Sequence, residues 1–321
     1  MTGALVLAID GGNSKTDVAL ADTDGRVLRS VRTGPFLPQS AGVAAAVDVV
    51  WQAVRQAGMP HEVGHVAACV AGADLPAEEE ALAVEFAARG FLGDIVVRND
   101  TFALLRAGAS GPWGVAVVCG AGINAVGVAP DGRVARFPAL GRVSGDWGGS
   151  QDLGEEVLWH AVRAEDGRGP ATALTGLVRA HFEVDAVADF TLGVHAGRFA
   201  PERLHELAPG LLAAAASGDA VAVALAERQA REIAVLAEVC LRRLGLLETP
   251  TEVVLGGGVL RARDPLLTRL LDAEFAARAP RAKQVVADVP PIVGAALLGL
   301  DRAGASPAAA DRLRAHWLTQ V

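Results

Sequence analysis

The sequence predicts an α/β protein made of two related domains, and three observations lead to that prediction. The chain has 321 residues, about twice the length of an average domain. A strand–glycine loop–strand–turn pattern occurs twice: residues 6–27 read VLAIDGGNSKTDVALADTDGRV and residues 115–134 read VAVVCGAGINAVGVAPDGRV. After each hairpin, apolar strands alternate with helices, and that order indicates parallel crossover connections within a sheet.

Each copy of the repeat has the pattern of a three-stranded hairpin. An apolar strand enters a loop with two glycines, returns as a second apolar strand and ends on the same tetrapeptide, Asp-Gly-Arg-Val, at residues 24–27 and 131–134. An Asp-Gly pair between apolar runs is a strong hairpin signal because glycine accepts a positive φ. Two homologous domains that each begin with this hairpin are the simplest explanation.

The elements after the first hairpin follow from periodicity and stop signals. Residues 42–57 are apolar at helical spacing and are followed by Gly58 and Pro60, which end a helix. The other expected elements of this half are a buried strand at 65–70 that ends at Ala71-Gly72, a helix at 77–88 with acidic residues in its first turn, and a strand at 94–98 that ends at Asn99-Asp100.

The second half repeats this plan in a longer form. A helix is expected at 150–163, and the Ala- and Leu-rich stretch 166–231 is expected to be mostly helical. Asp264 followed by Pro265 is an N-cap with proline at the first helical position. The other expected elements are a strand at 251–255 that ends in Gly256-Gly257-Gly258, a helix from 265 to about 278, a strand at 285–287, a small-residue helix at 292–300 and an amphipathic helix at 309–318.

The composition excludes several classes of function. With 37 acidic against 29 basic residues the formal charge is −8, so the chain lacks the basic surface that binds nucleic acids or anionic membranes. Residues 1–12 lead straight into a strand, unlike a signal peptide, and no apolar run reaches the ~18 residues of a membrane span. Three distant cysteines, Cys69, Cys119 and Cys240, predict buried thiols rather than disulfides. A cytoplasmic protein is expected.

The first glycine loop has the composition of a phosphate site. Glycines let the backbone approach an anion, and hydroxyl and ammonium groups add donors. Asp10, at the end of the preceding strand, is suited to hold Mg²⁺ through water. An ordinary hairpin turn is the alternative, but the second loop favours two loops that face each other across a polyphosphate. The predicted phosphate ligands are Gly11, Gly12, Asn13, Ser14, Lys15 and Thr16 in the first loop and Gly120, Ala121, Gly122 and Asn124 in the second.

Two further motifs match known sites but lack the required context. Residues 120–125 fit the dinucleotide pattern G-x-G-x-x-A, yet they lead into a strand instead of a helix, and no acidic residue follows at the required spacing. Residues 61–65, His-Glu-Val-Gly-His, spell the zinc motif H-E-x-x-H, which needs a helix. Here the motif follows Pro60 and contains Gly64, so a solvated loop is expected instead.

Two aspartates stand where a ligand would be bound. Asp100 follows a strand and opens a helix, so it is either a helix N-cap or a general base at the carboxyl end of the sheet. Asp146 is flanked by glycines within residues 144–149, which favours a carboxylate held for a ligand over a core position. Trp147 is suited either to stack on a sugar or base or to pack in the core.

Together these motifs resemble the actin-like (hexokinase/Hsp70-type) ATPase superfamily, and within it the BadF/BadG/BcrA/BcrD-type ATPase family that includes N-acetylglucosamine kinases. The resemblance covers nearly the whole chain and implies two duplicated ribonuclease H-like domains with ATP and substrate in the cleft between them. The domains would span 1–106 and 107–305, with a helical insertion at about 150–245 and a final helix, about 306–321, packed back on the first domain. The residue roles that the resemblance implies are catalysis by Asp100, adenosine-side contacts by Gly256, Gly257 and Gly258, and sugar contacts by Gly72, Asp100, Gly145 and Asp146.

The sequence departs from the family pattern at the sugar side. Kinase members of the family have a segment similar to G-P-A-N-P after the first hairpin. Residues 34–38 of this chain read GPFLP, so Leu37 stands in the place of a sugar-binding Asn. Leu140 stands where these kinases resemble Trp, and Trp147 where many carry Glu. A leucine cannot hydrogen-bond a hydroxyl, and such a lost bond typically costs roughly 1–3 kcal/mol. We therefore expect a different sugar or a degenerate site.

The function expected from the sequence is Mg·ATP-dependent phosphoryl transfer to a sugar hydroxyl, with an amino sugar such as N-acetylglucosamine or glucosamine as substrate. ATP and Mg²⁺ are the expected cofactors, and relatives suggest a homodimer. One alternative is an ATPase that activates a partner protein, although the scattered cysteines supply no evident pair for a shared iron–sulfur cluster. Another is a non-catalytic sugar or nucleotide sensor, against which the intact Asp10, Lys15 and Asp100 argue.

Overall fold

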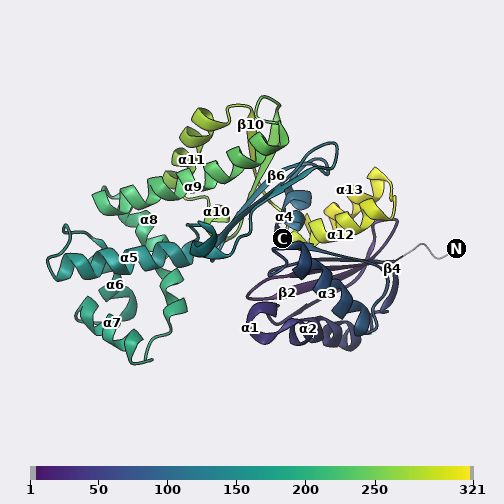
Figure 1. The fold of residues 1–321 in the computed structure, drawn as a ribbon, viewed down its shortest axis with the longest axis horizontal. Coiled ribbons are helices and arrows are strands. Elements are labelled where there is room, and N and C mark those ends of the chain that lie inside the picture. Colours follow the sequence, from purple (N-terminus) through teal and green to yellow (C-terminus); the bar gives the residue numbers. More distant parts are fainter. Residues whose placement is uncertain (1–4, 319–321) are drawn as a thin grey trace. The chain divides into compact units, whose positions relative to one another are not determined.

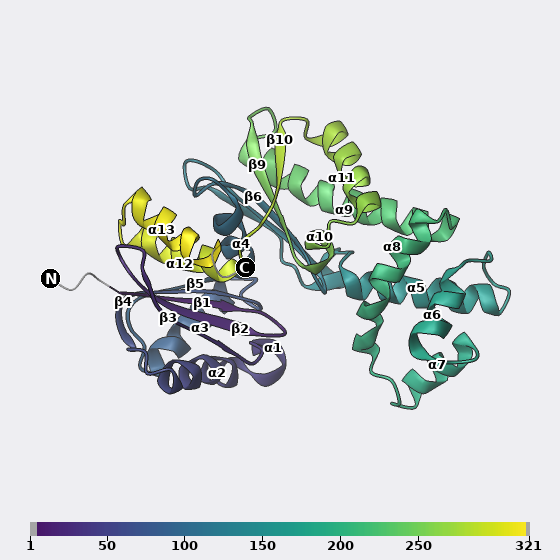
Figure 2. The same ribbon diagram turned by 180° about the vertical axis from the view of Figure 1, so that it is seen from behind.

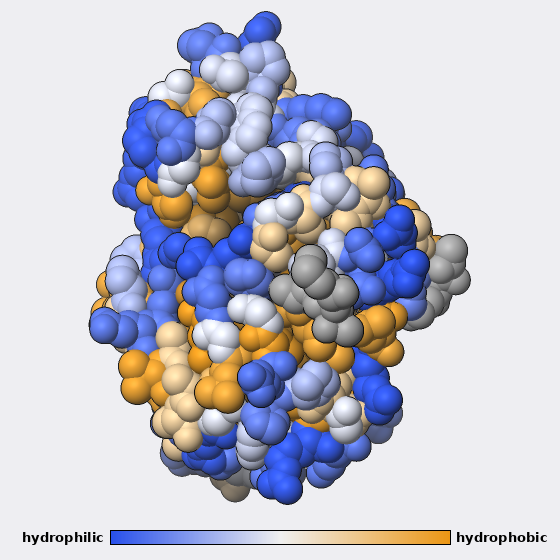
Figure 3. Space-filling model, turned by 90° about the vertical axis from the view of Figure 1, so that its right-hand side faces the viewer, coloured by the Kyte–Doolittle hydropathy of each residue, from blue (hydrophilic) through white to orange (hydrophobic). Residues whose placement is uncertain are grey.

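The computed structural model describes residues 5–318, which divide into two compact units (Figure 1 and Figure 2). The first unit contains residues 5–116, 126–138 and 287–318, and the second contains 117–125 and 139–286. The protein is an α/β protein with two five-stranded sheets, as the sequence predicts. On the face drawn in Figure 3, hydrophilic residues predominate and hydrophobic residues form patches between them.

The first sheet has the strand order β3-β2-β1-β4-β5. The first three strands form an antiparallel hairpin, whereas β4 and β5 run parallel to β1. Gly25, in the Asp-Gly turn between β2 and β3, has a φ of +82°, which explains the glycine there. The bounds are β1 Leu5–Gly11, β2 Thr16–Asp22, β3 Val27–Thr33, β4 Glu62–Val70 and β5 Leu92–Asn99.

The register of the parallel strands aligns their carboxyl ends. Asp10 of β1 lies opposite Cys69 of β4, and Gly11 lies opposite Val70. Val70 in turn lies opposite Asn99, the last residue of β5. Side chains that follow these three strands therefore emerge at the same edge of the sheet.

Helices cover both faces of the first sheet, because the alternation of a strand sends apolar side chains to each side. Figure 1 shows α2 and α3 on one face and α12 and α13 on the other. The first face is closed by residues such as Leu7, Ile9 and Phe86, and the second by small residues along α12. A side chain at Gly294 would clash with the backbone of Ala103 in α4, so this glycine allows the two helices to pack closely. The helix bounds are α1 Pro38–Ala41, α2 Val43–Gln56, α3 Pro76–Ala88, α4 Asp100–Gly108, α12 Pro291–Arg302 and α13 Pro307–Leu318.

The second sheet has the order β10-β9-β6-β7-β8, in which β9 and β10 are parallel and β7 and β8 antiparallel. The stretch predicted to be helical folds into a group of helices, with the 25-residue α9 buried along one side. Asp264 caps α11 by accepting the N–H groups of Leu266 and Leu267. The bounds are β6 Gly114–Cys119, β7 Ile123–Val128, β8 Val134–Arg136, η1 Gly141–Ser144, α5 Ser150–Glu165, α6 Leu174–Phe182, α7 Val187–His195, η2 Pro201–Leu207, α8 Ala208–Ala216, α9 Ala220–Leu244, β9 Thr251–Gly256, α10 Gly258–Arg261, α11 Pro265–Arg278 and β10 Ala282–Val286.

Two expectations about local structure are wrong. The segment 61–65 is not a solvated loop, because β4 begins at Glu62 and includes His65, whose Nδ1 lies 3.3 Å from Asp94 Oδ2 on β5. The last strand is Ala282–Val286 rather than 285–287, since pairing with β9 extends it toward its N-terminus.

Within residues 5–318, no single helix has the length and hydropathy of a membrane span. One bent pair, Pro201–Ala216 with Ala220–Leu244, meets the length and composition criteria jointly, with an angle of 113° between its members. Both members are core helices with buried faces.

Candidate active site

The carboxyl edge of the first sheet holds Asp100, the first residue of α4. Asn99, not Asp100, is the N-cap of this helix: its Oδ1 accepts the N–H of Thr101 at 3.0 Å and the Thr101 hydroxyl at 2.6 Å. The N-cap alternative for Asp100 is therefore wrong. A neighbouring residue performs the capping, so the Asp100 carboxylate is not needed for it.

Desolvation changes the acidity of Asp100. Its surroundings raise the pKa of the carboxyl from an ordinary 3.8 to about 6, although the N–H groups of Thr101 and of Asp100 itself act in the opposite direction. A carboxyl with a pKa near 6 is mostly ionised at neutral pH yet holds a proton far better than an exposed aspartate. These are the properties of a general base.

The negative charges of Asp10 and Asp100 both reach the buried thiol of Cys69. Burial raises the pKa of Cys69, and the negative charges of Asp10 and Asp100 raise it further, while Arg98 lowers it. The two carboxylates therefore lie on either side of the β4 end, as the strand register requires. Negative charge concentrated at one edge is the setting in which a divalent cation is bound.

The first glycine loop is a tight turn packed against the sheet. The N–H of Gly12 donates to the Lys15 carbonyl at 2.9 Å, and the Gly12 carbonyl accepts the N–H of Phe36. A side chain at Gly11 would press on Phe36 and Val70, so glycine is required there. Asn13, Ser14 and Lys15 are exposed at the tip of the turn.

Lys15 and Thr16, two of the predicted phosphate ligands, differ in their exposure. Lys15 Nζ lies 3.2 Å from Asp17, but Asp17 is also paired with Arg32 at 2.6 Å, so two cations share one carboxylate. Thr16 is fully buried, and its hydroxyl has no hydrogen-bond partner among residues 5–318. The exposed Lys15 ammonium is accessible to an incoming phosphate, whereas the Thr16 hydroxyl is enclosed by the protein and is not.

Gln39, which the sequence did not single out, lies against Gly72 just after the end of β4. Gly72 has a φ of +73°, and its Cα faces the side-chain amide of Gln39 at close range. A hollow of about 230 Å³ lies here, lined by Gly72, Gln39, Glu78 and five further residues. Gln39 lies only two residues after Leu37, yet no local signal identified it, because a tertiary contact between α1 and the turn after β4 brings it to Gly72.

In the second unit the structure brings together the loops predicted to bind ATP. The loop at 120–124 is joined to the start of α5, since the N–H groups of Ser150 and Gln151 donate to the carbonyls of Gly120 and Ala121 at 2.8 and 3.0 Å. Gly257, with a φ of +89°, packs directly on the backbone of Cys119, so the 256–258 turn lies beside that loop. Open space surrounds the Cα atoms of Gly120 and Gly122.

Gln229 is a second residue that the sequence did not reveal. It is fully buried on α9, where its Nε2 donates to Cys119 Sγ at 3.3 Å and its Oε1 accepts the N–H of Gly149 at 3.2 Å. Gly148 leaves the space that this side chain occupies. One buried amide therefore fixes both the strand that enters the glycine loop and the start of α5.

Asp146 and Trp147 have defined partners within the second unit. Asp146 Oδ2 accepts the hydroxyl of Ser144 at 2.6 Å and the N–H of Gly141 at 3.1 Å, so the turn holds this carboxylate in a fixed orientation. Trp147 is 5% exposed, with the Arg228 guanidinium 3.8 Å from its ring centroid and its indole N–H donating to Glu156. Of the two alternatives for Trp147, the structure has the packed one.

Comparisons with known proteins agree with this arrangement. Residues 7–299 match the model of the BadF/BadG/BcrA/BcrD ATPase family. The N-acetylmuramic acid/N-acetylglucosamine kinase of Clostridium acetobutylicum is 26% identical over 261 residues, covering 79% of this chain and 85% of that protein. The N-acetyl-D-glucosamine kinase of Dictyostelium discoideum is 25% identical over 320 residues, covering 94% and 99%.

Solved structures have the same fold. A candidate N-acetylglucosamine kinase from Chromobacterium violaceum superimposes with a TM-score of 0.69 at 25% identity, over 93% of this chain and all of that chain. A ROK family glucokinase from Streptomyces griseus, in complex with glucose and AMPPNP, gives a TM-score of 0.55 at 18% identity, over 92% of this chain and 98% of that chain. The two five-stranded sheets are thus the actin-like ATPase fold.

The role of Gln229 can be tested by replacing it with leucine. We expect Gln229→Leu to weaken the binding of a fluorescent ATP analogue several-fold and to lower the free energy of unfolding by about 1–3 kcal/mol, because the Gly149 N–H is left buried without its acceptor. Urea denaturation and fluorescence titration measure the two effects.

The matched control is Gln284→Leu, which removes a bond to Asp272 at an exposed site on β10. This variant should change neither quantity appreciably. If Gln229→Leu binds the nucleotide as tightly as the control, Gln229 does not position the glycine loop.

Proposed function

This chain belongs to the BadF/BadG/BcrA/BcrD ATPase family, and we propose that it is an ATP-dependent kinase that phosphorylates a hydroxyl group of an amino sugar. The observation that carries the proposal is Asp100, whose pKa of about 6 suits a general base and which shares a sheet edge with Asp10 and the first glycine loop. The names of the relatives from Clostridium acetobutylicum and Dictyostelium discoideum support an amino sugar as the acceptor.

In the proposed reaction, Asp100 accepts the proton of the sugar hydroxyl as that oxygen attacks the γ-phosphorus of ATP. The bond between the sugar oxygen and the γ-phosphorus forms as the bond between the γ-phosphorus and the bridging oxygen breaks, and that oxygen leaves with ADP. Backbone N–H groups of the 10–16 and 120–124 loops stabilise the charge on the transferred group. Lys15 adds an ammonium donor, and Gly256, Gly257 and Gly258 bind the adenosine side.

Mg²⁺ is part of the proposal, with Asp10 as the residue that holds it through water. The residues fit the ion, since Asp10 and Asp100 supply hard oxygen ligands at one edge and their combined charge already acts on Cys69. When bound, Mg²⁺ neutralises phosphate charge.

On the sugar side we assign Gly72, Gly145 and Asp146. The turn holds the Asp146 carboxylate in a fixed orientation, which supports a role in accepting hydrogen bonds from sugar hydroxyl groups. Leu37 cannot replace the amide of the related kinases, but Gln39 offers an amide two residues later, against Gly72. We therefore expect this protein to bind the amino group of its sugar through Gln39, unlike the related kinases, which use an asparagine in the place of Leu37. A homodimeric, cytoplasmic enzyme completes the proposal.

An ATPase that activates its partner through a shared iron–sulfur cluster is disfavoured. Cluster ligands are thiolates at an interface. Cys69, Cys119 and Cys240 are all buried, and burial raises the pKa of Cys119 and Cys240 to about 12. Such thiols stay protonated and inert.

The direct test of the base is Asp100→Asn, assayed with [γ-³²P]ATP and N-acetylglucosamine or glucosamine. We expect phosphoryl transfer to fall by roughly 10²- to 10⁴-fold while ATP binding is retained, since the amide cannot take a proton. Asp185→Asn, at an exposed loop position, should transfer phosphate like the unmodified protein. Transfer by Asp100→Asn at the control rate would remove Asp100 from the mechanism.

The raised pKa of Asp100 also predicts how stability depends on pH. Because the folded-state pKa of about 6 lies above the ordinary 3.8, the folded protein binds this proton more tightly than the unfolded chain does. The resulting stability is fully present below pH 3.8 and is lost as the pH rises through 6. Asp100→Asn, which stays neutral, should therefore unfold at higher urea than the unmodified protein at pH 8, and the difference should shrink toward pH 4.

The same ionisation should set the acid limit of the kinase. The rate constant kcat should rise with pH around 6 as Asp100 loses its proton. Equal urea midpoints for the two proteins at pH 8, together with a kcat independent of pH between 5 and 7, would mean that the carboxyl is not desolvated.

A further inference from the structure

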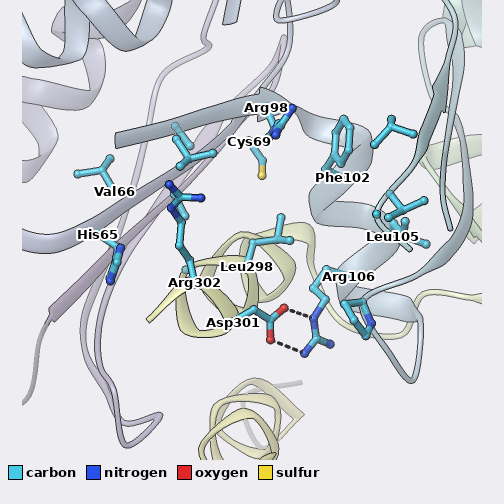
Figure 4. Close-up of a pocket in the computed structure, with 18 residues that line it drawn as sticks. His65, Val66, Cys69, Arg98, Phe102, Leu105, Arg106, Leu298, Asp301 and Arg302 are labelled. Atoms are coloured by element: carbon cyan, nitrogen blue, oxygen red, sulfur yellow. Dashed lines mark hydrogen bonds and ion pairs between the residues drawn. The ribbon is translucent and has the colours of Figure 1, made fainter. Parts of the chain in front are cut away.

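A cavity of about 350 Å³ lies within the first unit, and none of the loop residues assigned to ATP lines it (Figure 4). Its floor is the part of the sheet formed by β4 and β5, and its walls are α4, α12 and the turn that joins β7 to β8. The cavity exists because α12 packs on β1 and β4, whereas β5 is the edge strand of this sheet. Small floor residues, Ala67, Cys69 and Val96, leave the volume open.

The inner surface of the cavity is mainly apolar. Phe102 and Leu105 of α4 and Leu298 of α12 point into it in Figure 4. Val128 and Val134 complete the hydrophobic wall. A volume of this size, lined by apolar groups with a few charged ones, is typical of small-molecule sites.

The charged groups at the rim are not equally neutralised. Arg106 is paired with Asp301 through two hydrogen bonds, at 2.7 and 3.1 Å. Arg302 is paired in the same manner with Asp94, which also lies 3.3 Å from His65. These arginines therefore have their charge balanced within the rim.

Arg98 has no carboxylate of its own among residues 5–318. The carboxylate near it is Glu79 at 3.6 Å, but Glu79 is bound more closely by Arg136 at 2.8 Å. Two guanidinium groups thus share the Glu79 carboxylate, and Arg98 is the more loosely held of the two. Arg98 lies at the cavity, 5.5 Å from the centroid of the Phe102 ring, with 48% of its side chain exposed.

We propose that this cavity is a second ligand site that binds a small organic anion with a hydrocarbon body, of the class of medium-chain carboxylates. The anionic group pairs with Arg98, and the hydrocarbon part lies against Phe102, Leu105 and Leu298. The apolar lining favours the chain, and the loosely paired, half-exposed guanidinium of Arg98 favours an anion over a neutral or cationic ligand. The inference does not rest on the kinase proposal, because none of the groups assigned to catalysis lines the cavity.

The test is calorimetric titration of the full chain, without ATP or sugar, with octanoate and with octanamide, which has the same chain and no charge. We expect octanoate to bind about tenfold more tightly than octanamide. Arg98→Gln should abolish this difference and leave octanamide binding unchanged. Arg98→Gln therefore weakens octanoate binding. Glu79→Gln, which removes the shared carboxylate, should instead tighten octanoate binding.

A second variant tests the location of the hydrocarbon. Val96→Phe fills the floor of the cavity and should weaken both ligands, with urea denaturation used to verify that the variant is folded. Equal affinities for octanoate and octanamide, no octanoate binding at millimolar concentrations, or binding that Val96→Phe leaves unchanged would each overturn the proposal. Because no turnover is measured, these outcomes are independent of whether the protein is a kinase.

Discussion

The candidate site depends on the common register of three parallel strands. Asp10 lies opposite Cys69, and Val70 lies opposite Asn99, so the residues that follow β1, β4 and β5 meet at one edge. A shift of one residue in either pairing would turn the alternate side chains to the other face of the sheet and separate Asp10 from Asp100. Close packing fixes the register, since Gly11 admits Phe36 and Val70, and Gly294 admits α4 against α12.

Charge sharing is a second feature that recurs in the first unit. Asp17 is shared by Lys15 and Arg32 at the glycine loop, and Glu79 is shared by Arg98 and Arg136 beside the cavity. In each case two cations share one carboxylate, so one of the two is held only loosely, in a chain that is acidic as a whole. A loosely paired cation attracts an anion locally even in a chain whose net charge is negative.

Much of the fold could be predicted from local signals in the sequence. The repeated hairpin, the Asp-Gly turns and the helix cap at Asp264 each depend on residues close together in the chain, and the structure contains all three. The edge position of Asp100 was also predictable, because strand ends in a parallel sheet point to one side. Its pKa was not, since desolvation depends on the whole surroundings.

The features that were missed arise from contacts between distant segments. Gln229 reaches Cys119 and Gly149 from 110 and 80 residues away, and its helix has no motif that marks it. Gln39 meets Gly72, and Arg98 shares Glu79 with Arg136, through tertiary packing alone. Strand β10 was misplaced by three residues because pairing with β9, rather than local hydrophobicity, sets where it begins.

The central claim is that this protein transfers the γ-phosphoryl group of ATP to a sugar hydroxyl. The most direct measurement is ADP release from Mg·ATP with and without glucosamine, N-acetylglucosamine, N-acetylmuramic acid, glucose and mannose. We predict strong stimulation by one of the amino sugars, with one sugar phosphate formed per ADP. Slow ADP release that no sugar changes, or ATP binding without any turnover, would contradict the claim.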